Sequence, residues 1–282
     1  MATNLLIAMI NIKKYRDNDL KKIVAISNPE QPRVNKEGTP FDAFVKDSFC
    51  NSFSIKDPSK KMEVYQKEFS YLGSQNYPPD IIIRSGDAIE VKKVKGFGGT
   101  SIALNSSYPK HRLYSNGPMI TEELKNCEDW KEKDIIYCVG NVFSNKVRVI
   151  TFVCGDCYAA NADVYEKVKK PLIDGIKSLN LNLSKTRELA RLNKIDPLKI
   201  TDLRVRGMFQ IISPIRLFSE IISPSLKNNL SVFAIMRKEK FEIFSNEDKQ
   251  KAKKEMNVKD IKIKDPNSPN KLIDAKLISF SF

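Results

Sequence analysis

The chain is poor in the residues that build metal or disulfide frameworks. Among its 282 residues there are one histidine and five cysteines, and the cysteines are scattered along the sequence. An odd, scattered set of cysteines indicates a reducing, cytoplasmic compartment rather than a disulfide scaffold. Cys154 and Cys157 form one CxxC pair. A structural zinc site usually takes four ligands, from a second such pair or from histidines, so we do not expect zinc here.

Long apolar runs are also missing. No run approaches the roughly 18 apolar residues of a transmembrane helix, so we expect none. The apolar stretch 1–12 has no basic region before it and no small-residue cleavage site, and we interpret it as a buried first helix rather than a signal peptide. Hydrophobic residues make up 41% and charged residues 29% of the chain, which is typical of a globular protein.

Acidic residues are in deficit. The chain has 48 Lys and Arg against 34 Asp and Glu, a net charge of +14. This balance favours a polyanionic partner, nucleic acid first and an anionic membrane second, although a general lysine bias would give the same charge. An RNA-binding protein is not favoured, because no Gly-Phe aromatic motif of the base-stacking kind lies on a predicted strand.

The hydrophobic pattern predicts helices and strands in mixed order. Helices are predicted over 3–26, from 39 onward, in part of 159–179 and over 246–256. Strands are predicted over 79–83, 88–94, 134–142, 146–154, 203–212, 231–236 and 241–244, with a β-like tail. Loops are predicted over 27–39, 54–61 and 96–120, where breakers or the lack of a clear period interrupt the pattern.

Charged residues stand in an unusual place in one predicted hairpin. Asp80 opens an apolar run, a Ser-Gly-Asp turn follows at 85–87, and Glu90 and Lys92 return on the next strand. Residues two apart on a strand point the same way, so Glu90 and Lys92 share a face, and Asp80 can lie across from them. Two converging carboxylates repel each other unless a cation lies between them.

This set of side chains suits metal-assisted attack on a phosphodiester. Mg²⁺ prefers oxygen ligands and binds through one or two carboxylates plus phosphate oxygens. The neighbouring lysine can position a water or neutralise charge on the phosphate. The triplet acid-x-Lys occurs seven times in the chain, so the triplet alone is not informative. Glu90 differs from the other acids because it lies in an apolar strand and follows the Pro79-Asp80 pair. A hairpin with charges on its wet face is the structural alternative.

These residues resemble the motif of the PD-(D/E)xK nuclease superfamily. Pro79-Asp80 and Glu90-Val91-Lys92 match it with typical spacing. The resemblance implies an α/β fold, a mixed sheet flanked by helices with a restriction-endonuclease-like core, in which the acids bind Mg²⁺ and the lysine positions water. Many members carry a further acid on the preceding helix. Asp42 matches that place, where glutamate is more usual, and it is also explained as a favourable acid at a helix N-terminus.

A narrower resemblance covers residues 78–209. The stretches P-P-D-I-I-I-R-S-G-D-A-I-E-V-K-K, A-L-N-S-S-Y-P-K-H-R-L-Y, G-D-C-Y-A-A and I-D-P-L-K-I-T-D-L-R-V-R-G-M-F resemble the NgoPII-like type II restriction endonucleases. That family is associated with the site GGCC. The resemblance also implies a cognate DNA methyltransferase as a partner.

Two groups of residues are candidates for DNA contacts. Asn, Ser and Arg side chains can donate to base edges, and phosphate contacts position the protein. The loop after the catalytic strand supplies Asn105, Ser106, Ser107, Lys110 and Arg112, and a later strand supplies Arg204 and Arg206. A loop that satisfies its own backbone and a salt-bridged strand face are the alternatives. His111 is a candidate general base, but a single loop histidine is more often incidental.

The sequence thus predicts a Mg²⁺-dependent, site-specific endonuclease of double-stranded DNA. A palindromic site suits a two-fold symmetric protein, so we expect a homodimer. We expect one domain over 1–282, with a catalytic core at about 38–180 and recognition and C-terminal elements at about 181–282. A structure-specific repair or recombination nuclease and a non-catalytic basic DNA-binding protein remain the rival interpretations.

Overall fold

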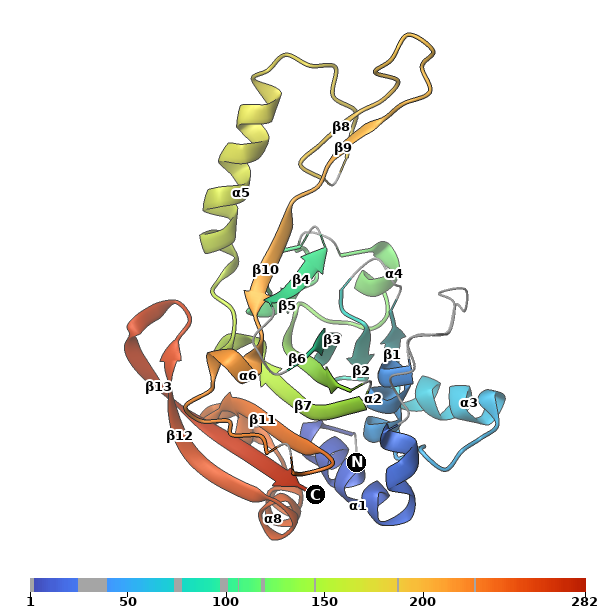
Figure 1. Cartoon of the computed structure of the whole chain (residues 1–282), viewed down its shortest axis with the longest axis vertical. Coiled ribbons are helices and arrows are strands. Elements are labelled where there is room, and N and C mark those ends of the chain that lie inside the picture. Colours follow the sequence, from blue (N-terminus) through green and yellow to red (C-terminus); the bar gives the residue numbers. More distant parts are fainter. Residues whose placement is uncertain are drawn as a thin grey trace.

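The computed structural model describes residues 3–24, 40–73, 78–96, 101–105, 107–117, 120–144, 146–186, 188–225 and 227–282. Its centre is a mixed sheet in the strand order β1-β2-β3-β6-β7-β11-β13-β12, with β5 paired to β6 beside this path (Figure 1). β3 is parallel to β6, and β7 is parallel to β11, whereas the other pairs are antiparallel.

The elements alternate along the chain. The first half contains α1 (Leu5–Val24), α2 (Pro40–Cys50), α3 (Pro58–Glu68), β1 (Phe69–Leu72), β2 (Ile81–Ile83), β3 (Ala88–Lys95), β4 (Ser101–Asn105), β5 (Arg112–Tyr114), α4 (Glu122–Lys125), β6 (Glu132–Phe143) and β7 (Lys146–Cys154). The second half contains η1 (Gly155–Cys157), α5 (Ala162–Lys177), β8 (Ala190–Leu192), β9 (Leu203–Val205), β10 (Met208–Ile212), α6 (Pro214–Leu217), β11 (Ser231–Arg237), α7 (Lys238–Ile243), α8 (Asn246–Glu255), β12 (Asn257–Asp265) and β13 (Ser268–Ser281).

The N-terminal helices pack on the sheet and form much of the core. Helix α1 contacts α2, α8 and β7, and its side chains Leu5, Leu6, Met9 and Ile12 are fully buried. Strands β6, β7 and β11 carry almost continuous runs of buried residues. Such runs are expected in the middle of a sheet that is covered on both faces. Within the described ranges, none of the helices has the length and apolar character needed to cross a membrane.

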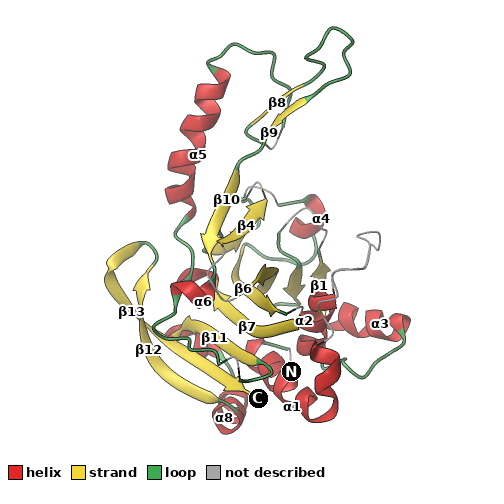
Figure 2. Ribbon diagram, in the orientation of Figure 1, coloured by secondary structure: helices red, strands yellow, loops and turns green. Residues whose placement is uncertain are grey.

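A projection extends from this body. Figure 2 shows α5 and the β8–β9 hairpin rising away from the central sheet. Helix α5 has no buried residue, and β8 pairs with β9 alone. The two-stranded pair of β4 and β10 lies near the base of the projection, where Met208 is opposite Asn105 and Ile212 is opposite Ser101.

Most predicted elements are present, with four corrections. The hairpins at 79–94 and 134–154 and the helices at 3–26, 39 onward and 246–256 are found, whereas the predicted loop 27–39 lies outside the described residues. The predicted loop 96–120 contains β4 and β5, and α3 begins inside the predicted loop 54–61. The single strand predicted over 203–212 is two strands with different partners. Residues 241–244 are not a strand, because they end helix α7, where Phe241 is buried and Ile243 is exposed.

Candidate active site

The hairpin of β2 and β3 brings three charged side chains together. The N–H of Asp80 donates to the carbonyl of Ile89 at 3.0 Å, and its Oδ2 accepts a 2.7 Å hydrogen bond from the N–H of Val91. Glu90 and Lys92 are two residues apart on β3 and point the same way. Lys92 Nζ donates to Glu90 Oε1. The structure therefore groups the three predicted catalytic residues, whose catalytic role remains a prediction.

A glycine allows the backbone of Asp80 to lie against the end of β1. The N–H of Gly73 donates to the carbonyl of Asp80 at 2.7 Å. A Cβ at position 73 would lie 2.5 Å from the carbonyl oxygen of Pro79 and 2.9 Å from Cα of Asp80. Both distances are shorter than van der Waals contact. A larger residue at 73 would therefore displace the backbone that carries Asp80.

Burial controls the charge of the cluster. Burial and the neighbouring Glu90 raise the pKa of Asp80 to about 7, although Lys92 and the N–H of Val91 act in the opposite direction. Burial alone would lower the pKa of Lys92, but the Glu90 and Asp80 carboxylates outweigh it and raise this pKa. Lys92 therefore remains an ammonium ion.

One oxygen of the cluster is left without a partner. Glu90 Oε2 is buried and has no hydrogen bond within the described structure. A buried carboxylate oxygen without a donor is costly, and more so beside a second carboxylate. Mg²⁺ prefers such oxygen donors and completes its coordination with water and phosphate oxygens. The residues present therefore fit a divalent cation.

Asp42 lies near this cluster but is not grouped with it. It stands in the first turn of α2, and the preceding Phe41 packs on Gly140 of β6, where a Cβ would lie 2.7 Å from the ring. The Asp42 carboxylate helps to raise the pKa of both Asp80 and Lys92, so it is within electrostatic reach. Among the described residues, no three His, Cys, Asp or Glu side chains are grouped closely enough to hold a metal ion. A ligand role for Asp42 remains a prediction.

A buried tyrosine connects the cluster to the segment 107–114, which contains the predicted DNA contacts Ser107, Lys110 and Arg112. Tyr137 is the partner of Glu90 in the register of β3 and β6. Its hydroxyl accepts a 2.6 Å hydrogen bond from the N–H of Lys110. The segment is thus attached to the strand that lies beside the catalytic strand.

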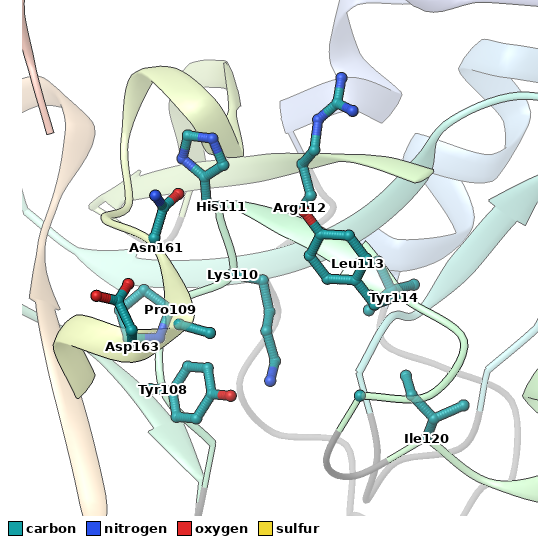
Figure 3. A pocket seen from close by; sticks show the side chains of 12 residues that line it. Tyr108, Pro109, Lys110, His111, Arg112, Leu113, Tyr114, Ile120, Asn161 and Asp163 are labelled. Atoms are coloured by element: carbon teal, nitrogen blue, oxygen red, sulfur yellow. The ribbon is translucent and has the colours of Figure 1, made fainter. Parts of the chain in front are cut away.

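The same segment lines a hollow of about 330 Å³ (Figure 3). Lys110 is 8% exposed, and its ammonium lies 3.9 Å from the centre of the Tyr108 ring. Burial, with the nearby Lys169, lowers the pKa of Lys110 to about 8. Figure 3 shows that Arg112 leaves the segment in the opposite direction, where it forms ion pairs of 2.6 and 2.8 Å with two carboxylates of β6. These two predicted DNA-binding side chains are therefore not brought together.

The other predicted loop contacts are less accessible or lie outside the description. Ser107 is buried, and its hydroxyl donates to the carbonyl of Tyr108 at 3.2 Å. The side chain of Asn105 and all of Ser106 lie outside the described residues. Nδ1 of His111 lies 3.0 Å from the carbonyl oxygen of Ala159, which gives this ring nitrogen a structural partner.

Arg204 and Arg206 share one carboxylate. Each lies 2.7 Å from Oε1 of Glu188. Both guanidinium groups remain more than half exposed, whereas Glu188 is largely covered. The two arginines do share a face, as the alternation of the sequence predicts, and they are salt-bridged. Their role in DNA binding stays a prediction.

Sequence reasoning missed a buried ion cluster at the turn of the β2–β3 hairpin. Lys240 of α7 donates to Oδ1 of Asp87 at 2.6 Å and to Oδ2 of Asp134 at 2.8 Å. Burial alone would lower the pKa of Lys240, but the two carboxylates raise it. Because Lys240 and Asp87 are 153 residues apart, no local pattern could have indicated this contact.

The cysteines of the CxxC pair are part of the core. Cys154 and Cys157 are buried and free, and burial raises the pKa of both thiols well above the ordinary value. Thiols in such surroundings are protonated and unreactive. They act here as small apolar side chains.

A mixed sheet flanked by helices, with the buried Glu90 carboxylate, the partly buried Asp80 carboxylate and a lysine on one hairpin, is the architecture of a restriction-endonuclease-like enzyme. The model of the NgoPII restriction endonuclease family matches residues 3–267. The type II restriction enzyme NgoPII of Neisseria gonorrhoeae is 38% identical over 283 residues, covering 98% of this chain and 99% of the relative. No solved structure matches.

The chain therefore belongs to the NgoPII restriction endonuclease family. This confirms the resemblance predicted from the sequence, together with the predicted fold class. It also confirms the predicted class of enzyme, a type II restriction endonuclease.

Proposed function

We propose that this chain hydrolyses phosphodiester bonds of double-stranded DNA at a short palindromic site, with Mg²⁺ as cofactor. The observation that carries the proposal is the buried Oε2 of Glu90, which lacks a hydrogen bond within the described structure although its carboxylate lies beside Asp80 and Lys92. Family membership supports the reaction class. The net charge of +14 suits a polyanionic substrate.

The three residues have separate roles in this proposal. Asp80 and Glu90 hold the metal ion, with Asp42 as a further ligand on the neighbouring helix. A divalent cation bound there polarises a phosphate oxygen and lowers the pKa of a bound water. Lys92, which its neighbours keep protonated, orients the attacking water and neutralises charge that develops on the phosphate.

We take GGCC as the first candidate site, because the family is associated with it. Seven residues contact DNA at phosphates or base edges in this proposal: Asn105, Ser106, Ser107, Lys110, Arg112, Arg204 and Arg206. Because one chain has a single Asp80–Glu90–Lys92 set and a palindrome has two strands to cut, we propose a homodimer. A cognate DNA methyltransferase protects the sites of the host.

The test is digestion of unmethylated phage DNA by the purified protein with Mg²⁺, with EDTA as one control. The matched variants are Lys92→Ala and Lys93→Ala, since Lys93 is the next residue, is exposed and points to the other side of the strand. We expect discrete fragments whose end sequences place every cut at a GGCC site. Cleavage is expected to fall by at least about 100-fold in Lys92→Ala and to remain in Lys93→Ala.

Other results select the rival functions. A smear of fragments that disappears in Lys92→Ala would support the proposed nuclease chemistry and would indicate a nuclease without sequence specificity. Retained DNA binding without cleavage in Mg²⁺ leaves a basic DNA-binding protein. Fragments cut at another sequence would support a site-specific endonuclease whose recognition site is not GGCC.

A further inference from the structure

Helix α5 carries an apolar stripe that the rest of the described chain leaves open. Val164, Val168 and Leu172 are spaced four residues apart and are 45%, 59% and 54% exposed, and Leu179 beyond the helix is 63% exposed. Residues at this spacing lie along one side of a helix. The helix therefore has an aliphatic surface that faces solvent in the single chain.

A second, half-buried side of α5 accounts for its contacts with its own chain. Tyr165, Lys169, Ile173 and Ile176 are partly covered. Tyr165 stacks on Tyr108 with ring centres 5.3 Å apart. The exposed stripe is thus additional to the side that docks the helix, and its apolar character is not explained by packing within the described chain.

The composition of α5 makes such an open helix unfavourable. Pro171 lies inside the helix and removes one backbone hydrogen bond, and Gly175 is among the weakest helix formers. Most helices in proteins are stabilised by packing of an apolar face rather than by propensity. A helix with Pro, Gly and no buried residue is therefore expected to gain support from a partner.

We propose that α5 packs against α5 of a second copy of this chain, antiparallel and around a two-fold axis. With the axis near residue 170, Val168 of each copy faces Leu172 of the other. Val164 then faces Gly175, where an added Cβ would meet nothing within 4 Å, so the helices can approach closely there. The stripe is complementary to itself, as a two-fold interface requires.

Charges beside the stripe favour this arrangement. Lys167 and Asp174 lie along the same edge of the helix, seven residues apart, and both are exposed. In the antiparallel pair, Lys167 of one copy faces Asp174 of the other, and the contact occurs twice. Lys167 already lies 3.6 Å from Asp163 in its own chain, in a pair that is exposed on both sides. In the dimer, Asp174 of the second copy would add a negative charge on the other side of Lys167.

The aliphatic surface extends beyond the helix itself. A stable interface covers about 800 Å² on each partner. A helix of 16 residues is about 24 Å long, so one side of α5 supplies only part of that area. The exposed Leu179 and Leu181 continue the apolar surface beyond the helix. DNA is not expected to bind this stripe, because its phosphates bind cationic rather than aliphatic side chains.

This inference rests on the proposed function at one point only: cutting both strands of a palindromic site requires two copies of the chain. The test is sedimentation equilibrium of the full chain without DNA, so it does not depend on cleavage. We expect the wild type to have twice the 32.2 kDa mass of one chain. Val168→Glu is expected to raise the dissociation constant by roughly 30-fold or more, as at an interface hot spot. Ile243→Glu, at a site that is 79% exposed on α7, is expected to leave it unchanged.

A charge exchange tests the register. Lys167→Asp and Asp174→Lys are each expected to weaken the dimer, and the double variant is expected to restore it. Far-UV circular dichroism identifies variants that fail to fold. A monomeric wild type, a Val168→Glu variant as dimeric as Ile243→Glu, or a double variant no better than the single ones would overturn the proposal. A dimer of this kind that does not cut DNA would refute the proposed function alone.

Discussion

Replacing Lys240 with methionine is expected to destabilise the fold strongly. Lys240 pairs with Asp87 and Asp134 at 2.6 and 2.8 Å, and the three side chains are 16%, 11% and 23% exposed. Removing one partner of a buried ion pair costs about 3–5 kcal/mol, because the remaining charge stays buried without compensation. Asp134 retains its 2.8 Å pair with Arg112. Asp87 is therefore the carboxylate that loses its ion pair, and the loss of stability comes mainly from its burial.

A matched control separates burial from charge. Lys251 lies at the same 2.6 Å from Glu247, but both side chains are more than half exposed. Lys251→Met is expected to change stability little, because water and salt screen an exposed ion pair. Urea denaturation followed by circular dichroism gives both free energies of unfolding. Against a typical total of about 5–15 kcal/mol, only the Lys240→Met loss is a large fraction.

The pH dependence gives a second check with a definite sign. Burial raises the pKa of Asp87 in the folded protein even with Lys240 present. Without the ammonium this pKa is expected to rise further. A carboxyl group with a folded pKa above its unfolded pKa binds its proton more tightly in the folded state, so stability falls as pH rises through that window. The cost of Lys240→Met is therefore expected to be smaller at pH 5 than at pH 8. A cost equal to that of Lys251→Met, or one that grows on acidification, would refute this reasoning.

Three further predictions concern the site and the projection. Gly73→Ala is expected to lower cleavage by at least about tenfold with little loss of DNA binding, because it displaces the backbone of Asp80; single-turnover kinetics beside a binding assay measures both. Tyr137→Phe leaves a buried backbone N–H without its acceptor and is expected to cost about 1–3 kcal/mol in urea denaturation. Arg204→Ala with Arg206→Ala is expected to lower the slope of log binding constant against log salt by about 0.9 for each lost phosphate contact, and an unchanged slope would remove these arginines from the DNA interface.

Sequence reasoning succeeded where the chemistry is local. The β2–β3 hairpin and its grouped charges were recognisable because Asp80, Glu90 and Lys92 lie within 13 residues and interrupt apolar strands. The hairpin at 134–154 was recognisable because its apolar runs are long. Residues 241–244 were misread because a four-residue run of alternating character fits a helix end as well as a strand.

The remaining features depend on contacts between distant segments. Strand β4 pairs with β10, which follows about 100 residues later, so its short apolar pattern resembled a loop. Glu188, which precedes β8, pairs with both Arg204 and Arg206, and Lys240 reaches the turn of the β2–β3 hairpin from the C-terminal part. No pattern within one segment contains such information.

The route of the chain between β7 and β11 has a consequence for how this enzyme can diversify. Strands β7 and β11 are parallel, and Ser231 lies opposite Val149, so the chain that leaves the sheet at Cys154 crosses back along β7 before it returns. Within this crossover the projection is an excursion whose ends lie close together, because Tyr165 and Phe209 have ring centres 5.9 Å apart. Doubling the length of such an excursion costs only about 0.6 kcal/mol in closure entropy. The part between Tyr165 and Phe209 is therefore the part of the chain that can be lengthened, shortened or exchanged between relatives while the hairpin at 79–95 keeps its geometry.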